Sequence, residues 1–114
     1  MTDLQRTLVL LKPDAVRRRL AGTILARYEA RGLDIVALEH RHVDGAMADR
    51  HYADHVEKPW YPPLREYFIS GPLVALVLEG PFAVDVVRGM NGVTNSVVAA
   101  PGTIRGDFSL SNRE

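Results

Sequence analysis

Six consecutive apolar residues stand at positions 73–78, in the run Leu73-Val74-Ala75-Leu76-Val77-Leu78. A strand points alternate side chains to opposite faces, so this run is apolar on both faces. A strand covered on both faces is typical of the middle of a sheet. We therefore place residues 73–78 at the centre of a sheet and work outward from them.

Two more segments predict strands. Thr7 to Leu11 is a short apolar run rich in strand formers, and Lys12-Pro13-Asp14 ends it. Leu33 to Val43 is apolar at first and polar towards its end. The sequence thus predicts three strands, of which the one at 73–78 is central.

The segment after the first strand predicts a helix that begins at Pro13, because proline suits the first helical turn. Apolar side chains recur there at every fourth position: Val16, Leu20, Ile24 and Tyr28. Gly22 falls within this stripe and predicts a split into two helical pieces. Gly32 predicts the C-terminal cap.

Shorter helices are predicted in the second half of the chain. Asp44 is suited to cap one helix, Pro59-Trp60-Tyr61-Pro62-Pro63 leads into another, and Gly80-Pro81 opens a third. From Asn91 to Glu114 the sequence shows little periodicity and predicts a long loop. Loops of that length inside a compact domain are usually functional.

The order of these elements indicates the fold class. Strand, helix, strand, helices, strand and helix is the order of an α+β protein with the ferredoxin-like split βαβ pattern. We expect an antiparallel sheet with helices on one face. Two βαβ halves contribute four strands and only three are found, so the final strand is expected to be missing from this chain. Residues 1–114 are expected to be a single domain that is incomplete at its C-terminus.

The composition excludes several classes of protein. Lys and Arg number 14, as do Asp and Glu, so the basic excess of a general nucleic-acid binder is absent. There is no cysteine, which excludes disulfides and thiolate metal sites. The sequence has no apolar run long enough to span a membrane, and its start lacks the features of a signal peptide. A cytoplasmic protein without nucleic-acid or membrane partners is the expectation.

Several side chains are suited to binding phosphate. Lys12 lies where an apolar strand passes into a helix, and a cation beside free backbone N–H groups suits an anion. Arg88 and Arg105 add cations and Thr94 adds a hydroxyl, the kinds of donor that phosphoryl transfer requires. Taken one at a time, each is equally a solvated surface residue. The sequence contains no glycine-rich phosphate loop, so such a site would be built from side chains.

Aromatic and histidine residues leave alternatives open. Trp60, the only tryptophan, is either an exposed platform for a nucleobase or an anchor for its loop. His51 and His55 are four residues apart, as metal ligands on a helix are, but no further ligand has convincing spacing. A solvated or structural role is favoured for both histidines.

Several short motifs share the order and spacing of one enzyme family: Arg6-Thr7-Leu8-Val9-Leu10-Leu11-Lys12-Pro13-Asp14, His51-Tyr52, Lys58-Pro59-Trp60, Ser70-Gly71-Pro72, Glu79-Gly80, Gly92-Val93-Thr94-Asn95 and Pro101-Gly102-Thr103-Ile104-Arg105-Gly106-Asp107-Phe108. Together they resemble the nucleoside diphosphate kinase family over essentially the whole chain. The first and last motifs are highly specific.

The resemblance implies transfer of the γ-phosphate of a nucleoside triphosphate to a nucleoside diphosphate through a phosphohistidine, in a ping-pong reaction. It also implies Mg²⁺ held through the nucleotide phosphates, with no metal ligand from the protein, and a hexameric or tetrameric homo-oligomer. The nucleotide-binding residues that it implies are Lys12, Tyr52, Trp60, Leu64, Arg88, Thr94 and Arg105. Trp60 takes the place of an aromatic ring that stacks on the base, and Tyr52 lies near the phosphohistidine.

In the family, the nucleophilic histidine follows the Arg-Gly-Asp-Phe motif on the final strand, and none of the histidines in this chain matches it. We expect that histidine just beyond Glu114, no catalytic residue within the chain, and no activity from the 114 residues alone. One alternative is a catalytically inactive nucleotide-binding or assembly subunit, if the chain naturally ends at Glu114. A ferredoxin-like RNA-binding domain is disfavoured, because the strands at 8–11 and 73–78 contain no aromatic residue.

Overall fold

The computed structural model describes residues 3–108, which contain one antiparallel sheet. Its strands are β1 (Leu4–Leu11), β2 (Asp34–His42) and β3 (Pro72–Pro81), in the order β1-β3-β2. β3 pairs with β1 from Leu11↔Val74 to Leu4↔Pro81. The prediction that residues 73–78 form the central strand is confirmed.

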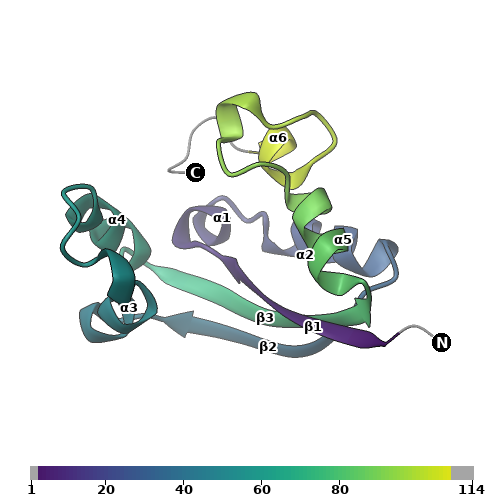
Figure 1. The fold of residues 1–114 in the computed structure, drawn as a ribbon, viewed down its shortest axis with the longest axis horizontal. Helices are drawn as coiled ribbons and strands as arrows, with labels where there is room; N and C mark the ends of the chain where they lie inside the picture. Colours follow the sequence, from purple (N-terminus) through teal and green to yellow (C-terminus); the bar gives the residue numbers. More distant parts are fainter. Residues whose placement is uncertain (1–2, 109–114) are drawn as a thin grey trace.

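Three helices cover one face of this sheet (Figure 1): α1 (Pro13–Arg17), α2 (Ala21–Ala30) and α5 (Ala83–Asn91). The main core lies between them and the sheet, with Leu76 and Leu78 of β3 packed against Ile24 and Val87 of the helices. Burying each such side chain stabilises the fold by roughly 1.5–3 kcal/mol. This layer holds α1, α2 and α5 in fixed positions beside the end of β1.

A second group of helices lies at one end of the sheet (Figure 1): α3 (Gly45–His51), the 3₁₀ turn η1 (Ala53–His55) and α4 (Tyr61–Phe68). Asp44 caps α3 by accepting a 2.8 Å hydrogen bond from the Met47 backbone N–H. Here Phe68 packs with Leu73, whose side chain alternates with those of the main core. At this end of the sheet, side chains of α3 and α4 therefore also contact residues that point away from the main core.

The remainder of the sheet face that points away from the main core is open within the described residues. On that face Leu8, which pairs with Val77, is 60% exposed. Leu38 of the edge strand β2 pairs with Leu76 of the main core and therefore lies on the helix side of the sheet, where it is 56% exposed. Among residues 3–108, no helix has the length and apolar character needed to cross a membrane.

Two local predictions were wrong. The first helix does not divide at Gly22, which lies inside α2; it divides between α1 and α2, where Arg19 takes a left-handed φ of 60°. The segment after Asn91 is not a plain loop, since it contains the 3₁₀ turn η2 (Ser96–Val98) and helix α6 (Ile104–Phe108). Gly32, with a φ of 100°, does end α2 as predicted.

The strand order establishes the topology. β1 and β2 flank β3 and both run antiparallel to it, which is the arrangement of the split βαβ unit. The predicted α+β, ferredoxin-like fold is confirmed. The expected position of a final strand, beyond residue 108, lies outside the described part of the chain.

Candidate active site

Lys12 stands at the junction of β1 and α1. It is the N-cap residue of α1, and the following proline occupies the first helical position. Burial, and next the nearby Arg105 guanidinium, hold the pKa of Lys12 below its ordinary value. A cation that is both partly buried and repelled by a second cation is stabilised when an anion binds between them.

A cavity of about 140 Å³ opens beside Lys12, at the end of β1. Its polar lining comes from both halves of the chain: Lys12, Asp14, Arg18, Tyr28, Tyr67, Asn91, Thr94 and Arg105. Apolar side chains such as Ile24 and Phe108 complete the wall. Three of the predicted phosphate ligands, Lys12, Thr94 and Arg105, therefore share one cavity.

Arg105 reaches this cavity from α6, and two contacts fix its surroundings. Its Nη1 donates a 2.8 Å hydrogen bond to the carbonyl oxygen of Gly92, just after α5 ends. Arg18 donates from its Nη1 to the carbonyl oxygen of Phe108, at 2.7 Å. The first bond ties α6 to the end of α5, and the second ties the last residue of α6 to Arg18 in the wall of the cavity.

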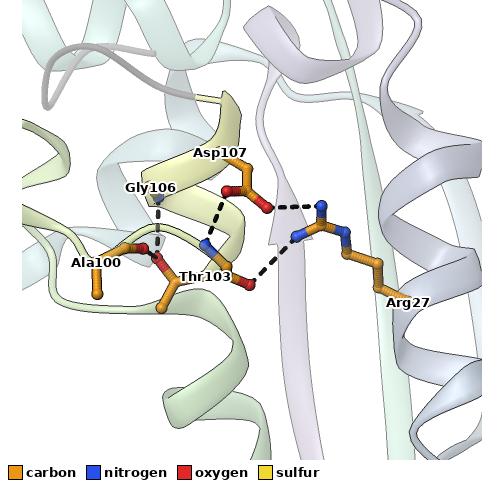
Figure 2. A network of polar contacts seen from close by, with 6 residues as sticks. Arg27, Ala100, Thr103, Gly106 and Asp107 are labelled. Atoms are coloured by element: carbon orange, nitrogen blue, oxygen red, sulfur yellow. Dashed lines mark hydrogen bonds and ion pairs between the residues drawn. The ribbon is translucent and has the colours of Figure 1, made fainter.

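Figure 2 shows how α6 is held against α2. Arg27 of α2 pairs with the Asp107 carboxylate at 2.7 Å and donates a 3.4 Å hydrogen bond to the carbonyl oxygen of Gly102. The Gly102 backbone N–H donates to Asp107 at 2.8 Å. This N–H first, and Arg27 second, hold the pKa of the Asp107 carboxyl below its ordinary range. Thr103 accepts from the Gly106 N–H at 3.0 Å and completes the network.

The other predicted nucleotide-binding residues do not line this cavity. Arg88 is an exposed residue of α5, while Tyr52, Trp60 and Leu64 lie on the α3–α4 side of the molecule. Trp60 is 50% exposed and its ring centroid is 5.1 Å from that of His55. α4 itself borders the cavity through Tyr67. The structure thus separates a cationic cavity from an aromatic region, on two parts of the fold.

The histidines also lie away from the cavity. All four are within the described residues, on β2, α3 and η1, and none lines it. His51 stacks on Phe68 with ring centroids 5.5 Å apart, and His42 contacts the carbonyl oxygen of Ile69 at 3.0 Å. The expected position of a nucleophile, beyond Glu114, lies outside the described residues.

The fit of a divalent metal can be judged from the side chains. Between residues 3 and 108, no group of three or more His, Asp or Glu side chains is arranged to hold a metal ion. Of the described residues that line the cavity, Asp14 alone carries a carboxylate, which lies 3.5 Å from the Arg18 guanidinium. These residues fit a metal that arrives with a phosphate ligand, since Mg²⁺ commonly keeps one or two protein ligands and binds through substrate phosphates.

Sequence reasoning missed several residues of the cavity. Tyr28 was assigned to an apolar helical stripe, yet its hydroxyl lies in the cavity wall and donates to Asn91 at 2.6 Å. Arg18 belongs to a run of three arginines that resembles a solvated helix face. Tyr28 and Arg18 line the cavity because segments far apart in the sequence meet there, and residue spacing along the sequence does not reveal such contacts.

A cavity lined by the cationic side chains of Lys12, Arg18 and Arg105, with the hydroxyl of Thr94 beside them, is typical of proteins that bind anionic, phosphate-bearing ligands. Comparison with known proteins narrows the class. A sequence model described as nucleoside diphosphate kinase matches residues 5–114. The chain therefore belongs to the nucleoside diphosphate kinase family.

Individual relatives agree. The chain is 71% identical over 109 residues to a nucleoside diphosphate kinase of a Nocardioides species, covering 96% of this chain and 81% of that protein. It is 58% identical over 108 residues to the nucleoside diphosphate kinase of Cutibacterium acnes, covering 95% and 78%. The predicted family and its class of enzyme, the phosphotransferases, are confirmed.

Solved structures of the family have the same fold. A halophilic nucleoside diphosphate kinase from Halobacterium salinarum, solved in complex with CDP, superposes with a TM-score of 0.92 at 42% identity, covering 97% of this chain and 74% of that one. A Borrelia burgdorferi nucleoside diphosphate kinase, solved as a transition-state mimic with vanadate and ADP, gives 0.87 at 40% identity, covering 93% and 66%.

Proposed function

We propose that the cavity beside Lys12 binds the polyphosphate of a nucleotide, for transfer of a γ-phosphate from a nucleoside triphosphate to a nucleoside diphosphate. The observation that carries the proposal is the meeting of Lys12, Thr94 and Arg105 in one cavity. The transition state of phosphoryl transfer spreads negative charge over three oxygens. A compact ammonium, a forked guanidinium and a neutral hydroxyl supply complementary donors for that charge.

The size of the cavity supports the proposal that only part of the nucleotide enters it. At about 140 Å³ it is smaller than the 300–1,000 Å³ of sites that enclose whole small molecules. We therefore propose that the phosphates enter it and that the base lies outside, towards Trp60. Stacking on a half-exposed indole accepts any base, because every base has a π-face. Tyr52 and Leu64 belong to this outer part of the proposed site, and Arg88 of α5 is proposed to contact the phosphates from outside the cavity.

Mg²⁺ is the proposed cofactor, held through the nucleotide phosphates. When bound there, it would neutralise part of the phosphate charge. The proposed nucleophile is a histidine supplied by sequence after Glu114, so that a phosphorylated enzyme would form between the two half-reactions. Acid-labile label from γ-³²P-ATP should then map to a peptide beyond residue 108. Label on His40, His42, His51 or His55 would contradict this assignment.

Nucleotide binding tests the site directly. Isothermal titration of the purified protein with ADP and Mg²⁺ should give a Kd that rises at least about tenfold in Lys12→Gln and in Arg105→Gln, the effect of losing a charge-assisted hydrogen bond. Arg6→Gln is the matched control: Arg6 pairs with Glu79 at 2.6 Å on the sheet and does not line the cavity. Equal Kd values for all four proteins would overturn the proposed site. Binding without transfer to GDP, in the full-length protein, would favour an inactive nucleotide-binding subunit.

We further propose a homo-oligomer, hexameric or tetrameric, working in the cytoplasm. The support is the exposure of apolar side chains on the outer strands β1 and β2, where Leu8, Val36 and Leu38 are each more than 40% exposed. Apolar residues in such a position are typical of surfaces buried between subunits. Light scattering coupled to gel filtration should give a multiple of the monomer mass; a monomer at micromolar concentration would contradict the proposal.

A further inference from the structure

A buried hydrogen bond links two elements in the wall of the cavity. Tyr28 of α2 is 1% exposed, and its hydroxyl donates to the side-chain oxygen of Asn91, the last residue of α5, at 2.6 Å. We infer that this bond positions the segment carrying Thr94, so that Tyr28 and Asn91 act as positioning residues for polyphosphate binding. The inference rests on the function proposed above and deepens it.

The geometry after α5 explains how one hydrogen bond can position the segment that carries Thr94. The chain leaves the helix at Gly92, whose φ is 85°, and reaches Thr94 two residues later. Tyr28 holds the side chain of Asn91, and Arg105 holds the carbonyl oxygen of Gly92 at 2.8 Å. The start of the segment is thus fixed from two sides, by one residue of α2 and one of α6.

The Tyr28 hydroxyl is suited to act as a hydrogen-bond donor at neutral pH. Burial raises the pKa of Tyr28 to about 12, against the opposing effects of the Arg105 guanidinium and the Asn91 hydrogen bond. The hydroxyl therefore keeps its proton at neutral pH and remains the donor in the pair. Arg105 lines the same cavity as Tyr28.

Loss of the hydroxyl leaves the Asn91 side chain without its partner and lets the end of α5 move. One hydrogen bond of this kind contributes an equilibrium factor of about fivefold. The segment that carries Thr94 must then become ordered when the phosphates bind, and the free energy of this ordering weakens the net binding. A nucleoside without phosphate makes no contact with this part of the site, so its affinity should be unaffected.

Tyr28→Phe tests the inference, because it removes only the hydroxyl and keeps the ring. Titration with ADP and Mg²⁺ should show a Kd about three- to fivefold weaker than wild type, while the Kd of adenosine stays within 1.5-fold. Ile35→Val is the control for a general loss of stability. Ile35 packs against the main core from β2 and does not line the cavity, so its loss of one methyl group should lower Tm without changing either Kd.

The outcomes separate the inference from the function on which it rests. Wild-type protein that binds no ADP refutes the proposed function. If wild-type protein binds ADP and Tyr28→Phe binds it equally well, the positioning role alone is refuted. The same holds if Tyr28→Phe loses affinity for ADP and for adenosine to the same degree.

A second variant checks the coupling. Tyr28→Phe combined with Asn91→Leu replaces both polar partners by apolar groups of similar shape, an exchange that is close to neutral. If the bond is what couples the two residues, the double variant should bind ADP no more weakly than Tyr28→Phe alone, because the single variant has already lost the bond. An affinity below that of Tyr28→Phe would overturn the inference.

Discussion

Replacing Gly92 with alanine adds one methyl group at the point where α5 ends. Gly92 has a φ of 85° and a ψ of 179°, a region of backbone conformation that is essentially restricted to glycine. Holding alanine there costs about 1–3 kcal/mol. The new Cβ would also lie 2.7 Å from Oγ1 and 2.8 Å from Cβ of Thr103, so that this side chain must move.

Moving Thr103 has a further cost. Its Oγ1 donates to the carbonyl oxygen of Ala100 at 2.6 Å and accepts from the Gly106 N–H at 3.0 Å. Giving up one or both bonds adds about 1–2 kcal/mol. The expected destabilisation of Gly92→Ala is therefore about 2–5 kcal/mol, a large part of the stability of an ordinary domain.

Urea unfolding followed by far-UV circular dichroism measures this loss as a lower midpoint. Gly89→Ala, three residues earlier in α5, is the matched control. A Cβ at Gly89 meets nothing within 4 Å, and alanine in a helix is favoured over glycine by about 0.5–1 kcal/mol, so this variant should be more stable than wild type. A Gly92→Ala protein within 0.5 kcal/mol of wild type would refute the reasoning, as would equal losses in both variants.

Three other predictions concern charge and backbone strain. Lys12→Met should raise the Tm of the ligand-free protein by a few degrees while abolishing ADP binding, because it removes a partly buried cation from a helix N-terminus. The pKa of Lys12 is lower in the folded than in the unfolded state. The Tm of Lys12→Met should therefore exceed that of wild type most at pH values below the folded pKa, and the difference should shrink as pH rises towards 10.5. A Tm difference that grows with pH would contradict this reasoning. Asp107→Asn should lower Tm at neutral pH, and the difference from wild type should vanish as pH falls through the depressed pKa of Asp107, since its contribution is present only while it is ionised. Phe82→Asn should stabilise the protein by about 0.5–1 kcal/mol in urea unfolding, because Phe82 is 59% exposed and holds a left-handed φ of 57° that asparagine adopts more easily; a lower midpoint would show that the ring packs usefully.

The elements that the sequence predicted well are those set by local pattern. The apolar run at 73–78 could only be central, and Pro13, Asp44 and Gly32 marked helix ends through chemistry that acts within a few residues. α6 was missed because five residues carry too little periodicity to show a helix. Its position depends on Arg27, 80 residues earlier than Asp107, and such a pairing leaves no trace in local spacing.

The residues of the candidate site also include some that the sequence predicted and others that it did not. Lys12 was predicted from its place between a strand and a helix, and Thr94 and Arg105 were predicted from their side-chain chemistry and supported by the family resemblance; the structure places all three in one cavity. Nothing in the sequence indicated that Tyr28 would be more than a core residue. Conversely, Arg88 was grouped with the phosphate ligands, and the fold places it outside the cavity.

The repulsion between Lys12 and Arg105 has a consequence for the empty protein. Burial, and next the charge of Arg105, disfavour the charged form of Lys12, so the fold without a bound anion carries an unfavourable electrostatic energy that an incoming anion relieves. Stability thereby becomes linked to ligand concentration through mass action. In a cell depleted of nucleotides, such a protein would be least resistant to heat and proteolysis at the moment when its substrates are scarce.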